Sequence, residues 1–266
     1  MIPVEVQRGD SPIVLGLPHT GTYVPDAIMA KLNARGQGLD DTDWHIHQLY
    51  DGLLPSATTV RATFHRYVVD ANRDPSGASL YPGQNTTGLV PLTDFEGRDI
   101  WTDAPNEAEI EARREAFHAP YHAALEAEMA RVRDLHGVAI LYDCHSIRSE
   151  IPFLFEGTLP DFNIGTNLGA TCAPEIEAAV QDICAAVEGY TATTNGRFKG
   201  GWTTRHYGRP EEGFHAIQME LAQSTYLSAE AAPWTYDSAN ADRLRAHLKT
   251  ILTTLADLAP TLKGTT

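Results

Sequence analysis

Four short apolar segments of this chain each end in a cluster of polar residues. They are PIVLGL at 12–17, RYVVD at 66–70, VAILYD at 138–143 and HAIQMEL at 215–221. Apolar runs of this length without strict alternation are typical of strands that are covered on both faces. The four segments therefore predict strands of a buried sheet, with polar side chains gathered where the strands end.

Helical periodicity separates these strands. One apolar stripe runs from near Asn106 to Leu135, where Gly137 is well placed to end the helix, and Pro120 is expected to kink it. Strands that alternate with helices predict an α/β fold with a mixed, mostly parallel sheet. Ligands of such folds bind beyond the carboxyl ends of the strands. Two further helical patterns cover 174–187 and the segment from about Ser238 toward Pro260.

The chain is expected to form a single domain over residues 1–266, because it shows no internal repeat and no linker-like change of composition. Two polar segments, 74–103 and 195–210, have neither helical nor strand periodicity. Long loops without regular structure are uncommon in compact domains. We therefore predict that both segments are active-site loops, either a lid or an ordered cover.

The composition excludes several kinds of partner. A formal net charge of −15 argues against nucleic acid and against anionic membranes, since both require a broad basic surface. No apolar run is long enough to span a membrane, and the N-terminus lacks the pattern of a signal peptide. Three unevenly spaced cysteines do not form a disulfide framework, so we expect a cytoplasmic protein. An anionic small molecule remains a suitable partner if cations cluster locally.

Two histidines, His19 and His145, follow the ends of separate predicted strands. A single histidine among the eleven of this chain is more often a hydrogen-bonded core residue than a ligand. Two histidines at the carboxyl ends of strands, however, can converge on one point, and neutral imidazole is a common zinc ligand. We therefore take both as candidate metal ligands.

A third ligand is available in DDTDWHIHQLY, which holds several donors. The alternative is that an acid of this segment caps a helix, and we give the two interpretations equal weight. Asp43 would fit both, because one carboxylate oxygen can cap while the other binds metal. The available side chains are Asp40, Asp41, Asp43, His45 and His47.

Glu220 lies among apolar residues at the end of a predicted strand. A buried carboxylate needs a partner, a nearby metal or a shifted pKa. A salt bridge to an arginine has comparable weight, but beside a metal-bound water Glu220 would be a suitable general base.

The predicted loops and strand ends carry more cations than the net charge suggests. A single one of them is more often a solvated surface charge, but as a set they predict a socket for carboxylates. No phosphate-binding loop, Gly-x-Ser-x-Gly elbow or His-Glu-x-x-His helix is present. The cations are Arg66, Arg73, Arg148, Arg197, Lys199, Arg205 and Arg209.

An ordered set of motifs resembles the N-formylglutamate amidohydrolase (deformylase) family, over about residues 10–255. The motifs are PHTG, DDTDW, RYVVDANRDP, LYPGQNTTGLVP, DCHSIRSEIPFLFEGTLPDFNIGT, NGRFKGGWTTRHYG and AIQMELAQSTYL. That family is similar in fold to zinc exopeptidases, a three-layer α/β/α sandwich. The resemblance implies a hydrolase of linear amide C–N bonds that converts N-formyl-L-glutamate to L-glutamate and formate, the last step of one route of histidine degradation.

The resemblance also implies zinc, or another divalent metal, with His19 and His145 as ligands and Glu220 as the general base. Asn72 and Arg73 resemble the pair that binds the substrate carboxylate in carboxypeptidases. The exopeptidases place a glutamate ligand three residues after the first histidine, but Thr22 stands there in this chain. We therefore choose Asp43, over Asp41, as the carboxylate ligand.

The resulting hypothesis is that a zinc-bound water attacks the formyl carbon while Glu220 accepts its proton. Arg66 would stabilise the oxyanion, and Arg73 with Asn72 would bind one carboxylate of the substrate. Arg197, Lys199 or Arg205 would bind the other carboxylate. Arg148 would either contact the substrate or anchor a loop. Two alternatives are a deacylase or carboxypeptidase for another N-acyl amino acid, and a carboxylate-binding protein without catalysis.

Overall fold

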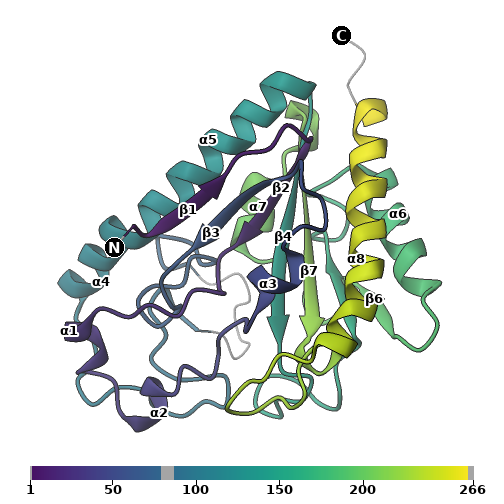
Figure 1. Cartoon of the computed structure of the whole chain (residues 1–266). Coiled ribbons are helices and arrows are strands. Elements are labelled where there is room, and N and C mark those ends of the chain that lie inside the picture. The colour runs from purple at the N-terminus through teal and green to yellow at the C-terminus, as the bar shows by residue number, and fades with distance from the viewer. Residues whose placement is uncertain (1, 79–86, 263–266) are drawn as a thin grey trace.

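The sheet at the centre of the molecule has seven strands among residues 2–78 and 87–262, which are the residues that the structure, a computed structural model, describes. The strand order is β1-β3-β2-β4-β7-β5-β6, and β4 and β7 point toward the end of the sheet where the loops gather (Figure 1). The strands are β1 Val4–Gln7, β2 Ile13–Leu17, β3 Thr58–Ala62, β4 Ala139–Ile147, β5 Phe162–Gly165, β6 Ala192–Thr194 and β7 Phe214–Ala222.

The sheet is mixed and mostly parallel. Strands β3, β2, β4 and β7 run parallel to one another, and β6 runs parallel to β5. Strand β1 pairs with β3 and strand β5 pairs with β7 in the antiparallel sense. The predicted α/β class with a mixed sheet is confirmed.

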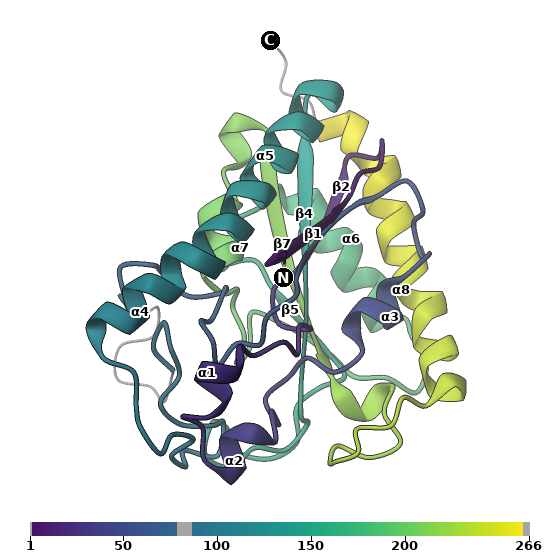
Figure 2. The same cartoon turned by 60° about the vertical axis from the view of Figure 1, so that its left-hand side comes forward.

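Helices cover both faces of the sheet and give three layers (Figure 2). One face carries α5 with its extension α4 and also α7, whereas the other carries α3, α6 and α8. The short helices α1 and α2 lie in the connection after β2. The helices are α1 Asp26–Met29, α2 Ala34–Gln37, α3 Ile46–Tyr50, α4 Glu107–Arg113, α5 Ala119–His136, α6 Pro174–Ala185, α7 Trp202–Tyr207 and α8 Ser238–Leu258.

Alternation along β4 divides its side chains between the two layers. Ile140, Tyr142 and Cys144 pack in the core under α6 and α8, while Leu141 packs in the core under α5. Successive side chains of a strand point to opposite faces. Asp143 and His145 therefore share the face of Leu141, so the polar end of β4 is directed toward the α5 and α7 layer.

The predicted strands 12–17, 138–143 and 215–221 correspond to β2, β4 and β7, but β4 is longer than predicted. It continues to Ile147, so His145 lies inside the strand and pairs with Glu220 of β7 instead of following the strand end. The strand continues through these polar residues because the backbone of β4 stays hydrogen-bonded to β7 as far as Ile147.

The predicted strand at 66–70 is wrong. These residues form a turn and a loop after β3, and Tyr67, Val68 and Val69 are fully buried in the core under α5. A short apolar run can fill a core from a loop as well as from a strand. The strand of this region is β3, which precedes the apolar run.

The long helical pattern from Asn106 is interrupted by one wide turn. Asn106 caps α4 through the backbone N–H of Glu109, and Gly137, with φ of 76°, ends α5. Between α4 and α5 lies a π-helical turn, Arg114–His118, and the predicted kink residue Pro120 stands in the first turn of α5. The helix is therefore irregular just before the proline.

The two predicted loops differ in structure. The segment 195–210 was predicted to be a loop, but part of it forms the helix α7. The described parts of 74–103 contain turns and isolated bridges, such as that between Thr93 and Asp99, and residues 79–86 lie outside the described part. None of the helices among residues 2–78 and 87–262 combines the length with the hydropathy that a membrane span requires.

Candidate active site

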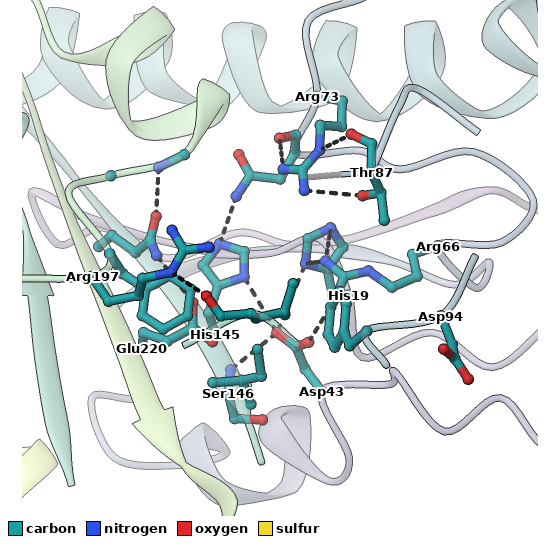
Figure 3. Close-up of a pocket in the computed structure, with 18 of the residues that line it drawn as sticks. His19, Asp43, Arg66, Arg73, Thr87, Asp94, His145, Ser146, Arg197 and Glu220 are labelled. Atoms are coloured by element: carbon teal, nitrogen blue, oxygen red, sulfur yellow. Dashed lines mark hydrogen bonds and ion pairs between the residues drawn. The ribbon is translucent and has the colours of Figure 1, made fainter. Parts of the chain in front are cut away.

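Three candidate ligands, His19, Asp43 and His145, meet at the carboxyl ends of β2 and β4 (Figure 3). One donor atom of each side chain lies within 4.8 Å of the others, and all three side chains are buried. Two imidazoles and one carboxylate are a donor set that suits a catalytic zinc or another divalent transition metal, with a coordination position left for water or substrate. The structure thus shows a buried group that can hold a metal.

Both histidines present the same ring nitrogen to Asp43. Its Oδ2 atom lies 3.9 Å from Nδ1 of His19 and 3.3 Å from Nδ1 of His145. The other ring nitrogens face two further buried acids, at 2.7 Å from Asp70 Oδ1 and 3.1 Å from Asp143 Oδ1. Metal-binding histidines commonly use their second nitrogen in this way, which fixes the tautomer. The surroundings of the three residues therefore fit a metal bound through Nδ1.

Asp43, rather than Asp41, belongs to this group. The backbone N–H of Asp43 donates to the His19 carbonyl at 3.1 Å, and its Oδ2 accepts from the Ser146 N–H at 3.1 Å. It does not cap α3, whose N-cap is His45 without a side-chain hydrogen bond. Asp41 is turned away, because its Oδ2 accepts from the Tyr67 hydroxyl at 2.7 Å and the Phe95 N–H at 2.9 Å.

The two histidines differ in their electrostatic surroundings. Burial and then the charge of Arg66 lower the pKa of His19. Burial also opposes charge on His145, but Asp143 and then Asp43 raise the pKa of His145 well above its ordinary value. A cation bound between them would replace the proton that the acids near His145 favour.

Glu220 lies beside His145 on the neighbouring strand (Figure 3). Its side chain is buried, and its Oε2 accepts a hydrogen bond from Gln218 Nε2 at 3.1 Å. Burial raises the pKa of Glu220 to about 8, which brings this carboxyl close to the range where an acid can exchange protons near neutral pH.

Arg66 lies on the opposite side of the group, against His19 (Figure 3). Its Nη2 atom is 2.6 Å from His19 Nδ1, 2.9 Å from His19 Nε2 and 3.4 Å from Asp70 Oδ2. The guanidinium also lies over the Phe95 ring, with 4.8 Å to its centroid. Arg66 and a metal ion cannot both contact Nδ1 of His19. A bound metal would therefore displace the Arg66 guanidinium from this nitrogen.

A pocket opens from the candidate ligands, and three further candidate residues line it: Asn72, Arg73 and Arg197. Arg73 is held by Thr87, with Nε donating to its carbonyl at 3.0 Å and Nη2 to its hydroxyl at 3.1 Å. Arg197 Nε donates to the Leu154 carbonyl at 3.1 Å. Apolar side chains complete the wall, namely Phe95, Ile147, Phe153, Leu154 and Phe198.

Three of the predicted substrate residues do not line this pocket within the described part of the chain: Arg148, Lys199 and Arg205. Arg148 Nη1 donates to Glu96 Oε1 at 2.9 Å, which ties the end of β4 to the loop before α4. Arg205 Nε donates to the Gly200 carbonyl at 2.9 Å.

Comparison with known proteins gives the family of this chain. A family profile described as N-formylglutamate amidohydrolase matches residues 11–227. The chain belongs to the N-formylglutamate amidohydrolase family. The predicted resemblance and the prediction of an amidohydrolase enzyme are therefore confirmed.

Relatives in this amidohydrolase family cover nearly the whole chain. The N-formylglutamate deformylase of Pseudomonas aeruginosa is 45% identical over 252 residues, 94% of this chain and 94% of the relative. That of Pseudomonas putida is 45% identical over 251 residues, 93% of each chain. A solved N-formylglutamate amidohydrolase of Ralstonia eutropha has a TM-score of 0.81 at 24% identity, covering 97% of this chain and 98% of its own. A gene product of Agrobacterium tumefaciens shares the fold, with a TM-score of 0.67 at 19% identity and 95% coverage of both chains.

Three polar residues around the site of this amidohydrolase were not predicted from the sequence: Asp70, Gln218 and Thr204. Asp70 was taken as the end of a strand, yet it is fully buried and contacts His19. Gln218 precedes Glu220 by two residues, the spacing that places two side chains on one face of a strand. Thr204 gave no signal, because its segment had no recognisable period.

Proposed function

We propose that this chain hydrolyses N-formyl-L-glutamate to L-glutamate and formate with zinc held by His19, Asp43 and His145. Two observations support the substrate and the metal. The relatives at 45% identity are N-formylglutamate deformylases, and the buried donor set lies in a pocket that also holds an acid and several guanidinium groups. The bound ion would supply a Lewis acid that polarises a carbonyl and lowers the pKa of water to about 7.

Glu220 is the proposed general base. It would accept a proton from the attacking water and pass it to the amine nitrogen as the formyl C–N bond breaks. The hydrogen bond from Gln218 orients this carboxyl. Without a metal, burial raises its pKa to about 8. A divalent cation bound nearby would lower that pKa, so that the carboxylate is ionised when it accepts the proton. Atoms balance, since water supplies the hydroxyl of formic acid and the proton of the amine.

Arg66 is the proposed partner of the formyl oxygen. Its guanidinium is the cation beside His19, and it is held by Asp70 and stacked on Phe95. As the formyl oxygen gains negative charge, a fixed cation in a buried site stabilises it more than water would.

The carboxylates of the substrate are assigned to the pocket wall. Arg73 and Asn72 would bind one of them, and Arg197 would bind the other, because all three line the pocket. A guanidinium fork matches the geometry of a carboxylate. Arg148, Lys199 and Arg205 receive no substrate contact in this proposal.

The observation that carries the proposal is the meeting of His19, Asp43 and His145 beside Glu220 in this family. The test combines metal analysis of the purified protein with an assay of N-formyl-L-glutamate. We expect about one zinc per chain, loss of turnover on chelation, and recovery when zinc is restored. Turnover that survives both chelation and Glu220→Gln would show that the mechanism is wrong.

A substrate panel separates this activity from the alternatives. N-Acetylglutamate, N-acetylaspartate and a short peptide should be hydrolysed much more slowly than N-formylglutamate. A carboxylate-binding protein without catalysis would instead show a higher melting temperature with N-formylglutamate and no release of formate.

A further inference from the structure

Helix α7 contacts the polar end of β4 through one threonine. The Thr204 hydroxyl donates to Asp143 Oδ2 at 2.8 Å, and both side chains are fully buried. A buried carboxylate requires hydrogen-bond donors, since it has lost its water. Thr204 therefore satisfies one oxygen of an acid whose other oxygen, Oδ1, lies 3.1 Å from His145 Nε2.

The position of Thr204 is fixed from both ends of α7. At the start, the Gly201 N–H donates to Gln218 Oε1 at 2.7 Å. At the end, the Tyr207 hydroxyl lies 3.0 Å from His122 Nδ1 of α5 and donates to the His122 carbonyl at 3.2 Å. Because α7 is held against both β7 and α5, the backbone that carries Thr204 is fixed relative to Asp143.

Glycine at the start of α7 permits this close approach. A Cβ atom at Gly201 would lie 2.3 Å from Asn72 Nδ2, far inside van der Waals contact. Asn72 Nδ2 is itself 3.2 Å from His145 Nε2. The start of α7 therefore packs directly against Asn72, which is another neighbour of His145.

We propose that Thr204 is a positioning residue for metal binding, which acts on His145 through Asp143. Its hydroxyl holds the carboxylate in the orientation that faces His145 Nε2, so that the imidazole ring is kept with Nδ1 directed toward Asp43 and the proposed metal position. The inference rests on the proposed metal site and adds a residue outside the ligands and their direct neighbours. Outer residues of this kind tune metal affinity through the tautomer and orientation of the ligand.

The neighbouring residue Thr203 provides a matched control. Both threonines belong to α7 and both are fully buried. Among the described residues, the Thr203 hydroxyl has no hydrogen-bond partner. Its backbone N–H donates to Asn72 Oδ1 at 2.8 Å, and a side-chain substitution retains that bond. Thr203→Val and Thr204→Val thus make the same change at the same depth, and only the second removes a hydrogen bond.

The experiment measures zinc affinity of the full-length, metal-stripped protein by competition with a chromogenic chelator. We expect Thr204→Val to bind zinc about tenfold more weakly, the lower end of the range for outer-shell partners. Thr204→Ser should recover affinity close to wild type because it restores the hydroxyl, and Thr203→Val should remain close to wild type. Urea unfolding of the metal-free variants confirms that both valine forms are folded.

Three results would overturn the inference. They are wild-type affinity in Thr204→Val, equal weakening in Thr203→Val, and no recovery in Thr204→Ser. If the wild-type protein binds no divalent metal, the proposed function fails as well. If the wild-type protein binds zinc and releases formate while Thr204→Val matches it, only the role of Thr204 fails.

Discussion

The two histidines of the site lie in contrasting surroundings, although their ring centroids are only 5.0 Å apart. His19 stands in the loop after β2, where Arg66 touches its ring and helps to lower its pKa. His145 lies within β4, where Asp143 and Glu220 are near and its pKa is raised. We call the His19 side the cationic half because it holds Arg66, whose charge Asp70 partly compensates. We call the His145 side the anionic half because it holds Asp143 and Glu220.

This difference gives the proposed reaction a direction. Negative charge that develops on a carbonyl oxygen is stabilised on the Arg66 side, whereas a proton is accepted on the Glu220 side. If both histidines had the same surroundings, the site would not determine on which side the carbonyl oxygen lies and on which side the proton of the water is accepted. The predictions below separate the two halves.

The largest effect is expected from the anionic half. Glu220→Gln keeps the shape of the side chain but removes the base, so we expect kcat to fall by about 10²- to 10⁴-fold. Zinc content should not fall, because Glu220 is not one of the three proposed ligands. Steady-state kinetics and metal analysis of the same preparation check this, and a variant that lost its zinc would instead place Glu220 among the ligands.

The cationic half should give the next largest effect. Arg66→Gln removes the proposed oxyanion partner, so kcat is expected to fall by about 10²- to 10³-fold. Zinc affinity should stay the same or rise, since a positive charge beside His19 is removed. Opposite changes in kcat and in affinity would distinguish this role from a general loss of structure, which lowers both.

The acids behind the two histidines offer a direct comparison of the halves. Asp70→Asn and Asp143→Asn should each weaken zinc binding by about 10- to 100-fold. Asp70→Asn should cost more, because Asp70 also lies 3.4 Å from Arg66 and its loss leaves that cation uncompensated beside the metal. Chelator competition measures both affinities, and the reverse order would contradict the assigned polarity.

The last prediction concerns pH and the metal-free protein. Unfolded Glu220 ionises near its ordinary pKa of 4.5, whereas the folded protein keeps the proton up to about 8 because the carboxyl is buried. The stability that neutral Glu220 provides is complete below the unfolded pKa and is lost as the pH rises toward 8.

Between these pKa values, the Glu220 contribution to the free energy of unfolding should fall by about 1.4 kcal/mol per pH unit. Urea unfolding at pH 5.5 and pH 7.5 compares chelated wild type with chelated Glu220→Gln, in which this contribution is absent. Equal pH dependence in the two proteins would mean that burial does not shift this group.

Much of the fold follows from the sequence, because long elements carry periodicity. The helices that became α5, α6 and α8 and the strands that became β2, β4 and β7 have enough apolar residues to show their period. Strand β1 is short and largely exposed, and β6 has only three residues, so neither carries a recognisable pattern. The apolar run 66–70 misled because a buried loop and a buried strand have the same composition.

The candidate site was only partly predictable for a different reason. His19, His145 and Glu220 could be selected because polar residues that follow or end an apolar run are conspicuous. Asp43 could be selected because its segment holds several possible donors. The contacts of Asp70 with His19 and of Thr204 with Asp143 join residues that are 51 and 61 positions apart. Such contacts depend on how the layers pack, which periodicity does not specify.

The register in which β4 pairs with β7 determines whether the residues of the site face one another. In that ladder His145 stands opposite Glu220, and Asp143 stands opposite Gln218. A slip of one residue would turn one strand's polar side chains into the apolar layer under α6 and α8, because successive side chains alternate between faces. Misregistered chains would therefore lack the site, so the same ladder that completes the sheet also assembles the groups proposed for the reaction.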